Sequence, residues 1–293
     1  MISSASPVWL DRSVFPFTSC YRDLGVDHMH YVDEGAGAPL VFVHGVPTWS
    51  FNYRKLIAHF APHYRCIAMD HLGFGLSSKP TDWSYNPPDL ATHVEHLIDG
   101  LGLRNITLVV HDWGGPLSLS YAIKYSTNVR RIVLFNTWLW PSQGDLRTSL
   151  TARLLASPLY HLLEDRLNFT ARFFIPQVMG AAPLPHSIHQ HYIAPLRRRA
   201  NRQGYWSLVR SIFHAGPWLD SLWQQRDRLA DIPTLVMWGI KDKAFTQRDL
   251  NRWQNTLHNV RVLAYPQVGH FPHEEVAEAV CLHMGAFLEH TAR

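Results

Sequence analysis

The sequence predicts a single α/β protein with a mostly parallel sheet and a helical insertion. Short apolar runs rich in β-branched residues alternate with amphipathic stretches. The run ITLVVHD at 106–112 shows too little alternation for a half-exposed strand, and this is typical of a strand covered on both faces. The alternation then stops between about residues 141 and 222. Because strands that alternate with helices usually pair in parallel, we expect one sheet flanked by helices.

The first half of the chain is expected to supply most of the sheet. Three strands are predicted near its start, with DEGAGAP as a hairpin-like turn between the first two: MHYVDEG (29–35), PLVFVHG (39–45) and RCIAMDHLGFG (65–75). A helix is expected from about Ser50 to Phe60, after a proline-containing loop. The buried strand at 106–112 is followed by a predicted helix at 113–126 and a strand, RRIVLFN, at 130–136.

The insertion is expected to interrupt this core. Residues 141–222 contain no clear strand, and prolines break their amphipathic pieces. Alternation returns with TLVMWG (234–239), a helix near 247–256, RVLAYP (261–266) and a last helix from Glu275. We therefore predict an α/β core domain, residues 1–140 and 223–293, and a helical cap domain, residues 141–222.

Composition narrows the classes of function. The 293 residues are 46% hydrophobic and 17% charged, which excludes a disordered or fibrous protein. Lys and Arg number 27 against 23 Asp and Glu, without a long basic run, so no nucleic-acid partner is expected. The N-terminal MISSASPVWL lacks the order of a signal peptide, and no stretch approaches a membrane span. We therefore expect a cytoplasmic protein, without a membrane partner, that is a monomer or a small homo-oligomer.

Cysteine and histidine spacing indicates no metal site. Cys20, Cys66 and Cys281 lie too far apart for a metal-ligand pair or a disulfide framework. The histidines at 186, 189 and 191 are spaced by three and two, which fits neither one helix face nor a zinc pattern. We expect them in a solvated loop of the insertion.

The segment VVHDWGG at 109–115 takes a buried strand directly into a helix, with Asp112 at the turn and two glycines close behind it. In α/β hydrolases this tight turn exposes the nucleophile, and small residues must flank it. Asp112 stands where such proteins usually carry Ser. The alternative is that Asp112 only caps the helix, but a cap does not need two glycines beside it.

Three other segments fit the same arrangement. His44-Gly45-Val46-Pro47 closes the strand PLVFV, where this fold places its oxyanion-hole loop. Asp242 lies just past TLVMWG, and His270 follows RVLAYP. The order nucleophile, acid, histidine is the chain order of this fold. The alternatives are an ordinary turn residue at Asp242 and a surface-loop histidine at His270.

Five segments together resemble the haloalkane dehalogenases and their epoxide hydrolase relatives, over about residues 31–275: HGVPTWSFNYRKL, DHLGFGLSSKP, VVHDWGG, WGIKDKAF and VGHF. The resemblance implies an α/β-hydrolase fold with an eight-stranded, mostly parallel sheet and an inserted helical cap. HGxPTWS and GxKDK look closest to the branch whose catalytic acid follows the penultimate strand. Asn136, where another branch carries Glu, agrees with Asp242 as that acid.

An aspartate is already ionised at neutral pH, so Asp112 can displace a leaving group from an sp³ carbon and form an alkyl-enzyme ester. His270 would then deprotonate a water that attacks this ester, while Asp242 orients the imidazole. The backbone N–H groups of Val46 and Trp113 would stabilise the oxyanion. This scheme suits halides, epoxides and strained lactones. It uses no metal and no cofactor, and its partners are a small apolar substrate, water and a halide ion.

The leaving group separates these substrates. The resemblance places the indole N–H of Trp113 against a departing halide, with a second donor that is either an Asn in the HGNP loop or a Trp in the cap. Val46 occupies the Asn position and has no side-chain donor. The candidates for the second donor are Trp138, Trp140 and Trp206, with Trp138 first because it follows Asn136. Each of the three is otherwise an apolar anchor of the core or cap.

Other activities remain open at this point. An epoxide needs a proton donor for its ring oxygen, and epoxide hydrolases take it from cap tyrosines; Tyr160, Tyr192 and Tyr205 lie in the insertion. β-Lactone processing is also compatible. Fluoroacetate-type dehalogenation is disfavoured, because those relatives follow the nucleophile with Arg rather than Trp113. A non-catalytic binding protein is the remaining interpretation, although such proteins commonly lose the nucleophile or the base.

Overall fold

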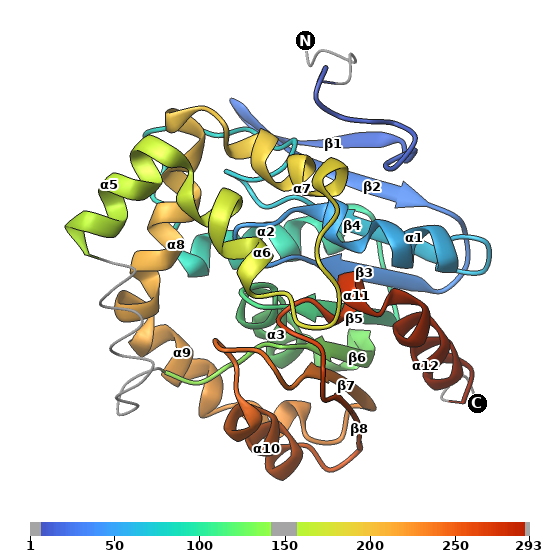
Figure 1. The fold of residues 1–293 in the computed structure, drawn as a ribbon. Helices are drawn as coiled ribbons and strands as arrows, with labels where there is room; N and C mark the ends of the chain where they lie inside the picture. Colours follow the sequence, from blue (N-terminus) through green and yellow to red (C-terminus); the bar gives the residue numbers. More distant parts are fainter. Residues whose placement is uncertain (1–6, 142–156, 291–293) are drawn as a thin grey trace.

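A computed structural model describes residues 7–141 and 157–290. Eight strands form one sheet in the order β1-β2-β4-β3-β5-β6-β7-β8 (Figure 1). The pairs from β4 through β8 are parallel, whereas β2 runs antiparallel to both β1 and β4. This confirms the predicted α/β fold with an eight-stranded, mostly parallel sheet. The strands are β1 (Ser19–Leu24), β2 (Asp27–Glu34), β3 (Pro39–Val43), β4 (Arg65–Met69), β5 (Ile106–His111), β6 (Val129–Phe135), β7 (Thr234–Gly239) and β8 (Val260–Tyr265).

Helices cover both faces of the sheet, so its central strands are buried on both sides. Alternate residues of β3 separate into two apolar clusters, with Val41 and Val43 on one face and Leu40 and Phe42 on the other. The first cluster includes residues of α2 and α3, and the second includes residues of α1 and α12. The core helices are η1 (Ser50–Tyr53), α1 (Arg54–Phe60), α2 (Pro87–Gly100), α3 (Gly114–Lys124), η2 (Ser126–Asn128), η6 (Arg226–Leu229), α10 (Gln247–Thr256), α11 (Pro272–Glu275) and α12 (Ala277–His290).

The expected hairpin between the segments that form β2 and β3 is wrong. β2 pairs with β1 and β4, and β3 lies on the far side of β4, between β4 and β5. The four residues 40–43 are fully buried, so this strand needs a neighbour on each side and cannot end the sheet as half of a hairpin. The real hairpin joins β1 to β2 through Gly25, which has a positive φ of 90°.

Between β6 and β7 the described residues form helices and no strand. Besides η6, they are α5 (Pro158–Leu167), the π-helix η3 (Thr170–Phe174), α6 (Ile175–Gln177), α7 (His186–Ile193), η4 (Ala194–Leu196), η5 (Arg199–Arg202), α8 (Gln203–His214) and α9 (Gly216–Trp223). Figure 1 shows α5 and α8 beside the sheet and α7 near β2. The boundary between cap and core stays a prediction. None of the described helices has the length and apolar character that crossing a membrane requires.

The predicted solvated loop at 186–191 is also wrong, because these residues lie in α7. His191 is buried, and its Nε2 accepts the backbone N–H of Asp11 at 3.1 Å. Its ring stacks on Phe51 with centroids 4.7 Å apart. His191 is therefore held by a hydrogen bond to the N-terminal segment and by stacking on a core ring. The charge and spacing of the histidines in the sequence do not reveal these contacts.

Candidate active site

Asp112 occupies a strained turn between β5 and α3. Its φ is +51°, the left-handed region that residues with a side chain seldom adopt. The turn is held by the N–H of Asp112, which donates to the carbonyl of Asn136 at 3.1 Å, and by the hydroxyl of Thr137, which donates to the carbonyl of Asp112 at 2.6 Å. A Cβ atom on Gly114 would collide with the carbonyl of Val43, so the close approach of this turn to β3 requires glycine.

The Asp112 carboxylate points away from the helix and into the site. Helix α3 has no side-chain cap, so Asp112 is not its N-cap. Its Oδ1 accepts the backbone N–H of Val46 at 2.8 Å, and its Oδ2 lies 3.9 Å from Nε2 of His270. Burial raises the pKa of Asp112, and the opposing effects of His270 and of the N–H groups of Val46 and Trp113 do not cancel it. The carboxylate is therefore poorly solvated and more basic than usual, which favours nucleophilic attack.

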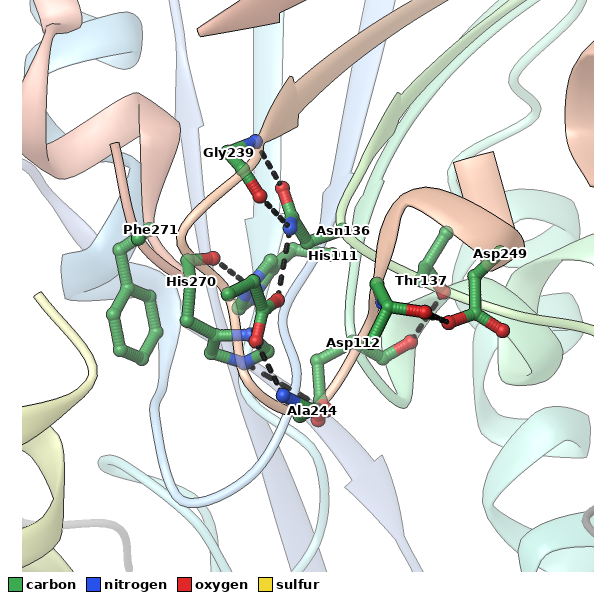
Figure 2. A network of polar contacts seen from close by, with 12 residues as sticks. His111, Asp112, Asn136, Thr137, Gly239, Ala244, Asp249, His270 and Phe271 are labelled. Carbon is green, nitrogen blue, oxygen red and sulfur yellow. Dashed lines mark hydrogen bonds and ion pairs between the residues drawn. The ribbon is translucent and has the colours of Figure 1, made fainter. Parts of the chain in front are cut away.

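His270 is held from behind by Asp242. Nδ1–H of His270 donates to Oδ2 of Asp242 at 2.7 Å. Figure 2 shows His270 within the network of polar contacts that also includes Asp112 and Asn136. This bond leaves Nε2, the nitrogen that faces Asp112, as the free base of the neutral ring. Burial alone lowers the pKa of His270, but the charge and hydrogen bond of Asp242 and the charge of Asp112 raise it above its usual value.

Two further groups orient Asp242. The side-chain amide of Asn136 donates to Oδ2 of Asp242 at 2.8 Å, and the backbone N–H of Ala244 donates to Oδ1 at 2.7 Å. Asn136 is itself fixed to the backbone of Gly239, donating to its carbonyl at 3.0 Å and accepting its N–H at 2.9 Å. Asp242 and His270 are 5% and 6% exposed, so neither is an ordinary turn or surface-loop residue. The structure thus brings Asp112, Asp242 and His270 together at the ends of β5, β7 and β8, on one edge of the sheet.

A cavity of about 870 Å³ opens onto Asp112 and His270. Its wall near the carboxylate is apolar, with Val46, Trp113 and Phe271 from the core and Ile175 and Val178 from the helical insertion among its lining residues. A largely apolar pocket with a few convergent polar groups is the usual form of a small-molecule site.

The three tryptophan candidates have different positions. Trp138 lines the cavity, and its ring contacts that of Trp113 edge-on with centroids 4.8 Å apart. Its Nε1 is buried and has no hydrogen-bond partner among the described residues. Trp140 also lines the cavity but packs against Trp223 and Trp253. Trp206 lines a separate small cavity instead.

The three tyrosines of the insertion also differ in their positions relative to the cavity. Tyr160 and Tyr205 line the main cavity, with their hydroxyl oxygens 3.2 Å apart. Tyr192 is not among its lining residues; its hydroxyl lies 2.9 Å from Oε2 of Glu274 and joins α7 to the core. Of the three, only Tyr160 and Tyr205 are placed to meet a ligand in this cavity.

Sequence patterns gave no sign of Glu275, which clamps the loop that carries His270. Its Oε1 accepts the N–H groups of Gly269 at 2.9 Å and Phe271 at 3.4 Å, and its Oε2 accepts those of Gly180 and Ala181 at 2.6 Å each. Every donor is a backbone group, so no pairing of side-chain types in the sequence could reveal the contact. Within the described residues, no group of three His, Cys, Asp or Glu side chains is arranged to hold a metal ion.

Comparisons with known proteins agree with this architecture. The profile of the alpha/beta hydrolase fold family matches residues 38–277. Haloalkane dehalogenase 2 of Mycobacterium tuberculosis is 35% identical over 273 residues, which cover 92% of this chain and 94% of that protein. A cis-3-alkyl-4-alkyloxetan-2-one decarboxylase of Shewanella oneidensis is 31% identical, covering 95% of this chain and 91% of that protein. The crystal structure of a haloalkane dehalogenase from Agrobacterium tumefaciens has a TM-score of 0.83 at 25% identity, covering 94% of this chain and 97% of that chain.

Proposed function

Because the chain belongs to the α/β hydrolase fold family and, within it, to the haloalkane dehalogenases, we propose that it hydrolyses carbon–halogen bonds of small apolar haloalkanes. The observation that carries this proposal is the Asp112 carboxylate. It is held at a left-handed turn with one oxygen on the N–H of Val46 and the other 3.9 Å from His270. A carboxylate in this position attacks an sp³ carbon. An ordinary ester hydrolase does not make this attack and does not need such a carboxylate.

The reaction follows in two steps. One Asp112 oxygen forms a bond to the carbon that carries the halogen, and the carbon–halogen bond breaks to release halide and leave an alkyl ester. Nε2 of His270 then takes a proton from water, whose oxygen attacks the carbonyl carbon of the ester. Asp242 stabilises the imidazolium, and the N–H groups of Val46 and Trp113 stabilise the oxyanion. Collapse of the intermediate breaks the ester carbon–oxygen bond, and the leaving alkoxide takes the proton from the His270 imidazolium to give the alcohol. Asp112 then loses one proton to solvent and is a carboxylate again.

Two indole N–H groups supply the halide site in this proposal. Trp113 and Trp138 line the same cavity with their rings in contact, and Nε1 of Trp138 is a buried donor without a partner in the described chain. An indole N–H in an apolar wall suits a large, weakly hydrated anion. Trp138 thereby replaces the side-chain donor that is lacking at Val46.

The helical insertion closes the cavity in this proposal. Tyr160, Ile175 and Tyr205 line it from the insertion, whereas Asp112 and Phe271 line it from the core. We therefore retain residues 141–222 as the cap domain and residues 1–140 and 223–293 as the core. A cap that contacts the ligand excludes water from the displacement step, which would otherwise solvate the Asp112 carboxylate.

Halide release from 1,2-dibromoethane and 1-bromobutane tests this function. The purified protein is expected to release bromide and acidify the medium, and Asp112→Ala is expected to do neither. His270→Ala is expected to retain the alkyl group, seen as added mass on the intact protein. A protein that folds but forms no adduct with any halide, epoxide or lactone contradicts the proposal.

An oxygen leaving group is the second candidate. Tyr160 and Tyr205 both line the cavity, and Val46 removes one donor from the halide site. The 31% identity to an enzyme named for decarboxylating an oxetan-2-one points to the same chemistry. Styrene oxide and a cis-3,4-dialkyl-β-lactone test it. Diol or alkene formation without bromide release from the haloalkanes would make the oxygen leaving group the principal one.

A further inference from the structure

A chain of polar side chains crosses the helical insertion behind the cavity wall. The hydroxyl of Thr170 lies 2.6 Å from that of Tyr160 and 2.6 Å from that of Tyr205. On its other side, Thr170 donates its hydroxyl and its backbone N–H to Oε2 of Glu164, each at 2.8 Å. The four side chains come from α5, η3 and α8, so the chain exists only when the insertion is folded.

This chain spans the space between two cavities. Tyr160, Thr170 and Tyr205 line the main cavity that holds Asp112. Glu164 lines a second cavity of about 50 Å³, whose other lining residues include the half-buried to exposed Asp165, Arg199 and Trp206. Glu164 is therefore next to a space that can admit water, and the tyrosines are next to the substrate space.

The charge on Glu164 is poorly compensated. Its side chain is buried, and Oε1 accepts no hydrogen bond within the described residues. Arg202 of η5 is the nearest opposing charge, but its guanidinium donates to the backbone carbonyls of Glu164, Asp165, Leu196 and Arg197 rather than to the carboxylate. Burial therefore raises the pKa of Glu164, against the hydrogen bonds of Thr170 and the charge of Arg202.

The other titratable groups around Glu164 do not supply a counter-charge. Tyr160 of its own helix and Tyr205 of α8 face it through Thr170, and burial raises the pKa of both phenols, so they stay neutral. Asp165 and Arg199 pair with each other at the outer cavity, and His161 lies beside them against Trp206. The protonation state of Glu164 thus depends mainly on its own burial, on Thr170 and on Arg202.

The proton on Glu164 sets the direction of the hydrogen bonds between the side chains along this chain. With Glu164 ionised, Thr170 donates to it and accepts from both tyrosines, so the phenol protons point away from the substrate space. With Glu164 protonated, its carboxyl donates to Thr170, Thr170 donates to one phenol oxygen, and that phenol proton is free to point into the cavity. The same wall is then an acceptor in one state and a donor in the other.

We propose that Glu164, Thr170, Tyr160 and Tyr205 form a proton-delivery chain that serves substrates with an alkoxide leaving group, such as epoxides and other strained cyclic ethers. The proposal rests on Asp112 acting as nucleophile. As Asp112 bonds to the ring carbon and the carbon–oxygen bond breaks, the ring oxygen takes a phenol proton. Thr170 reprotonates the phenol, Glu164 reprotonates Thr170, and the chain ends with an ionised Glu164. Hydrolysis of the ester by water completes the diol, and Glu164 regains a proton from water at the outer cavity.

Glu164 and Thr170 act here through the tyrosines, so they are positioning residues whose effect must appear in the leaving-group dependence. The experiment uses the His270→Ala protein, which stops after ester formation. Rates of ester formation are measured by intact mass with styrene oxide and with 1-bromobutane, and their ratio is compared in Glu164→Gln, Thr170→Val and Asp165→Asn. Asp165→Asn removes one carboxylate from the same helix, outside the chain, and is the matched control.

The epoxide-to-bromide ratio is expected to fall on the order of 10²-fold in Glu164→Gln and in Thr170→Val, and to stay unchanged in Asp165→Asn. With Glu164 intact, ester formation from the epoxide is expected to slow as the pH rises through the pKa of Glu164, and Glu164→Gln is expected to lack this dependence. The inference is overturned if Glu164→Gln and Thr170→Val both show the same epoxide-to-bromide ratio and the same pH profile as Asp165→Asn. Ester from the bromide but never from the epoxide overturns the inference alone, whereas no ester from either compound contradicts the proposed function too.

Discussion

Trp138 offers the cavity a hydrogen-bond donor that the folded chain does not use. Its indole Nε1 is buried without a partner among the described residues, and an unpaired buried donor costs about 1–3 kcal/mol. A bound halide would satisfy it, which gives the residue a role beyond the stacking of its ring on Phe245 at 5.1 Å. The ring of Trp113 contacts that of Trp138 edge-on, and both residues line the same cavity.

We therefore expect Trp138→Phe to weaken halide stabilisation while keeping an aromatic ring in place. The rate of bromide release from 1-bromobutane should fall about 10–100-fold, the loss of one hydrogen bond to a departing anion. The affinity for bromide, measured by quenching of tryptophan fluorescence, should fall with it. Trp206→Phe is the matched control, because Trp206 does not line the main cavity. Equal losses in the two variants would show that Trp138 is only an apolar anchor.

The pKa of His270 sets the pH dependence of the second step. Asp242 and Asp112 raise this pKa in the free enzyme despite burial. In the ester intermediate Asp112 carries no charge, so Asp242 is the main group that still raises the pKa of the imidazole. Only the neutral ring can take a proton from water. Turnover should therefore rise with pH as the imidazole loses its proton.

Asp242→Asn removes the two main causes that raise the pKa of His270 and leaves its burial. We expect the midpoint of the pH–kcat profile to move to lower pH and kcat at neutral pH to fall about 10²–10⁴-fold, because the ring also loses its orientation. Release of the alcohol product between pH 5 and 9 measures both. An unchanged midpoint would mean that another group controls this step.

Among the secondary-structure elements, the loop after β8 carries His270 and has no regular structure of its own. Glu275 fixes it from α11, and through Gly180 and Ala181 it fixes the adjoining part of the insertion as well. The N–H of His270 adds a bond to the carbonyl of Val178 at 2.9 Å. The position of the base thus depends on two segments that are distant in sequence.

Glu275→Gln should loosen this loop, because one amide oxygen cannot accept four N–H groups and its NH₂ would face two donors. The free energy of unfolding is expected to fall by about 2 kcal/mol. Decay of the Asp112 ester should slow more than its formation, since only decay needs His270. Rapid-quench mass spectrometry resolves the two steps. Glu278→Gln, on the exposed first turn of α12, is the control, and equal slowing of both steps would contradict a positioning role.

The elements that could be predicted from the sequence are those with a local signal. The apolar run of β5 and the helix α10 at 247–256 are confirmed, the latter with its capping box at Thr246 and Asp249. The edge strand β1 was missed because its residues are only half-buried and show no apolar run. The partner of β3 was misassigned because strand order depends on burial on both sides, which neighbouring residues do not encode.

For the molecule as a whole, the positions of Asp112, Asp242 and His270 were predictable because each follows a recognisable strand, and parallel strands end at one edge of the sheet. The groups that tune them were not. Asn136 reaches Asp242 across 106 residues, and Glu164 meets Tyr205 only through Thr170 in the folded insertion. Such contacts arise from packing between distant segments, which have no shared local pattern.

The same packing makes several histidines neutral. Burial lowers the pKa of His273 to about 3 and that of His93 to about 4, and it lowers the pKa of His44, His71 and His111 as well. In the unfolded chain each would take up a proton below about pH 6.5. A folded-state pKa below the unfolded value means that protons favour the unfolded chain, so stability falls as the pH drops from about 6.5. His270 differs from these histidines, because its pKa is raised and its protonation therefore opposes the trend.

His273 allows this to be tested at one site. Its ring stacks on Tyr53 with centroids 5.1 Å apart, and neither ring nitrogen has a partner among the described residues, so His273→Phe retains the packing and removes the titration. In wild type, protonation of His273 in the unfolded chain should lower the free energy of unfolding by about 1.4 kcal/mol when the pH falls from 7.5 to 5.5. Urea unfolding at the two pH values should therefore show that the free energy of unfolding of His273→Phe falls by about 1.4 kcal/mol less than that of wild type. The control is His59→Gln at an exposed position, and its free energy of unfolding should fall by as much as that of wild type. If the free energy of unfolding of His273→Phe falls by as much as that of the control, His273 does not take up its proton on unfolding.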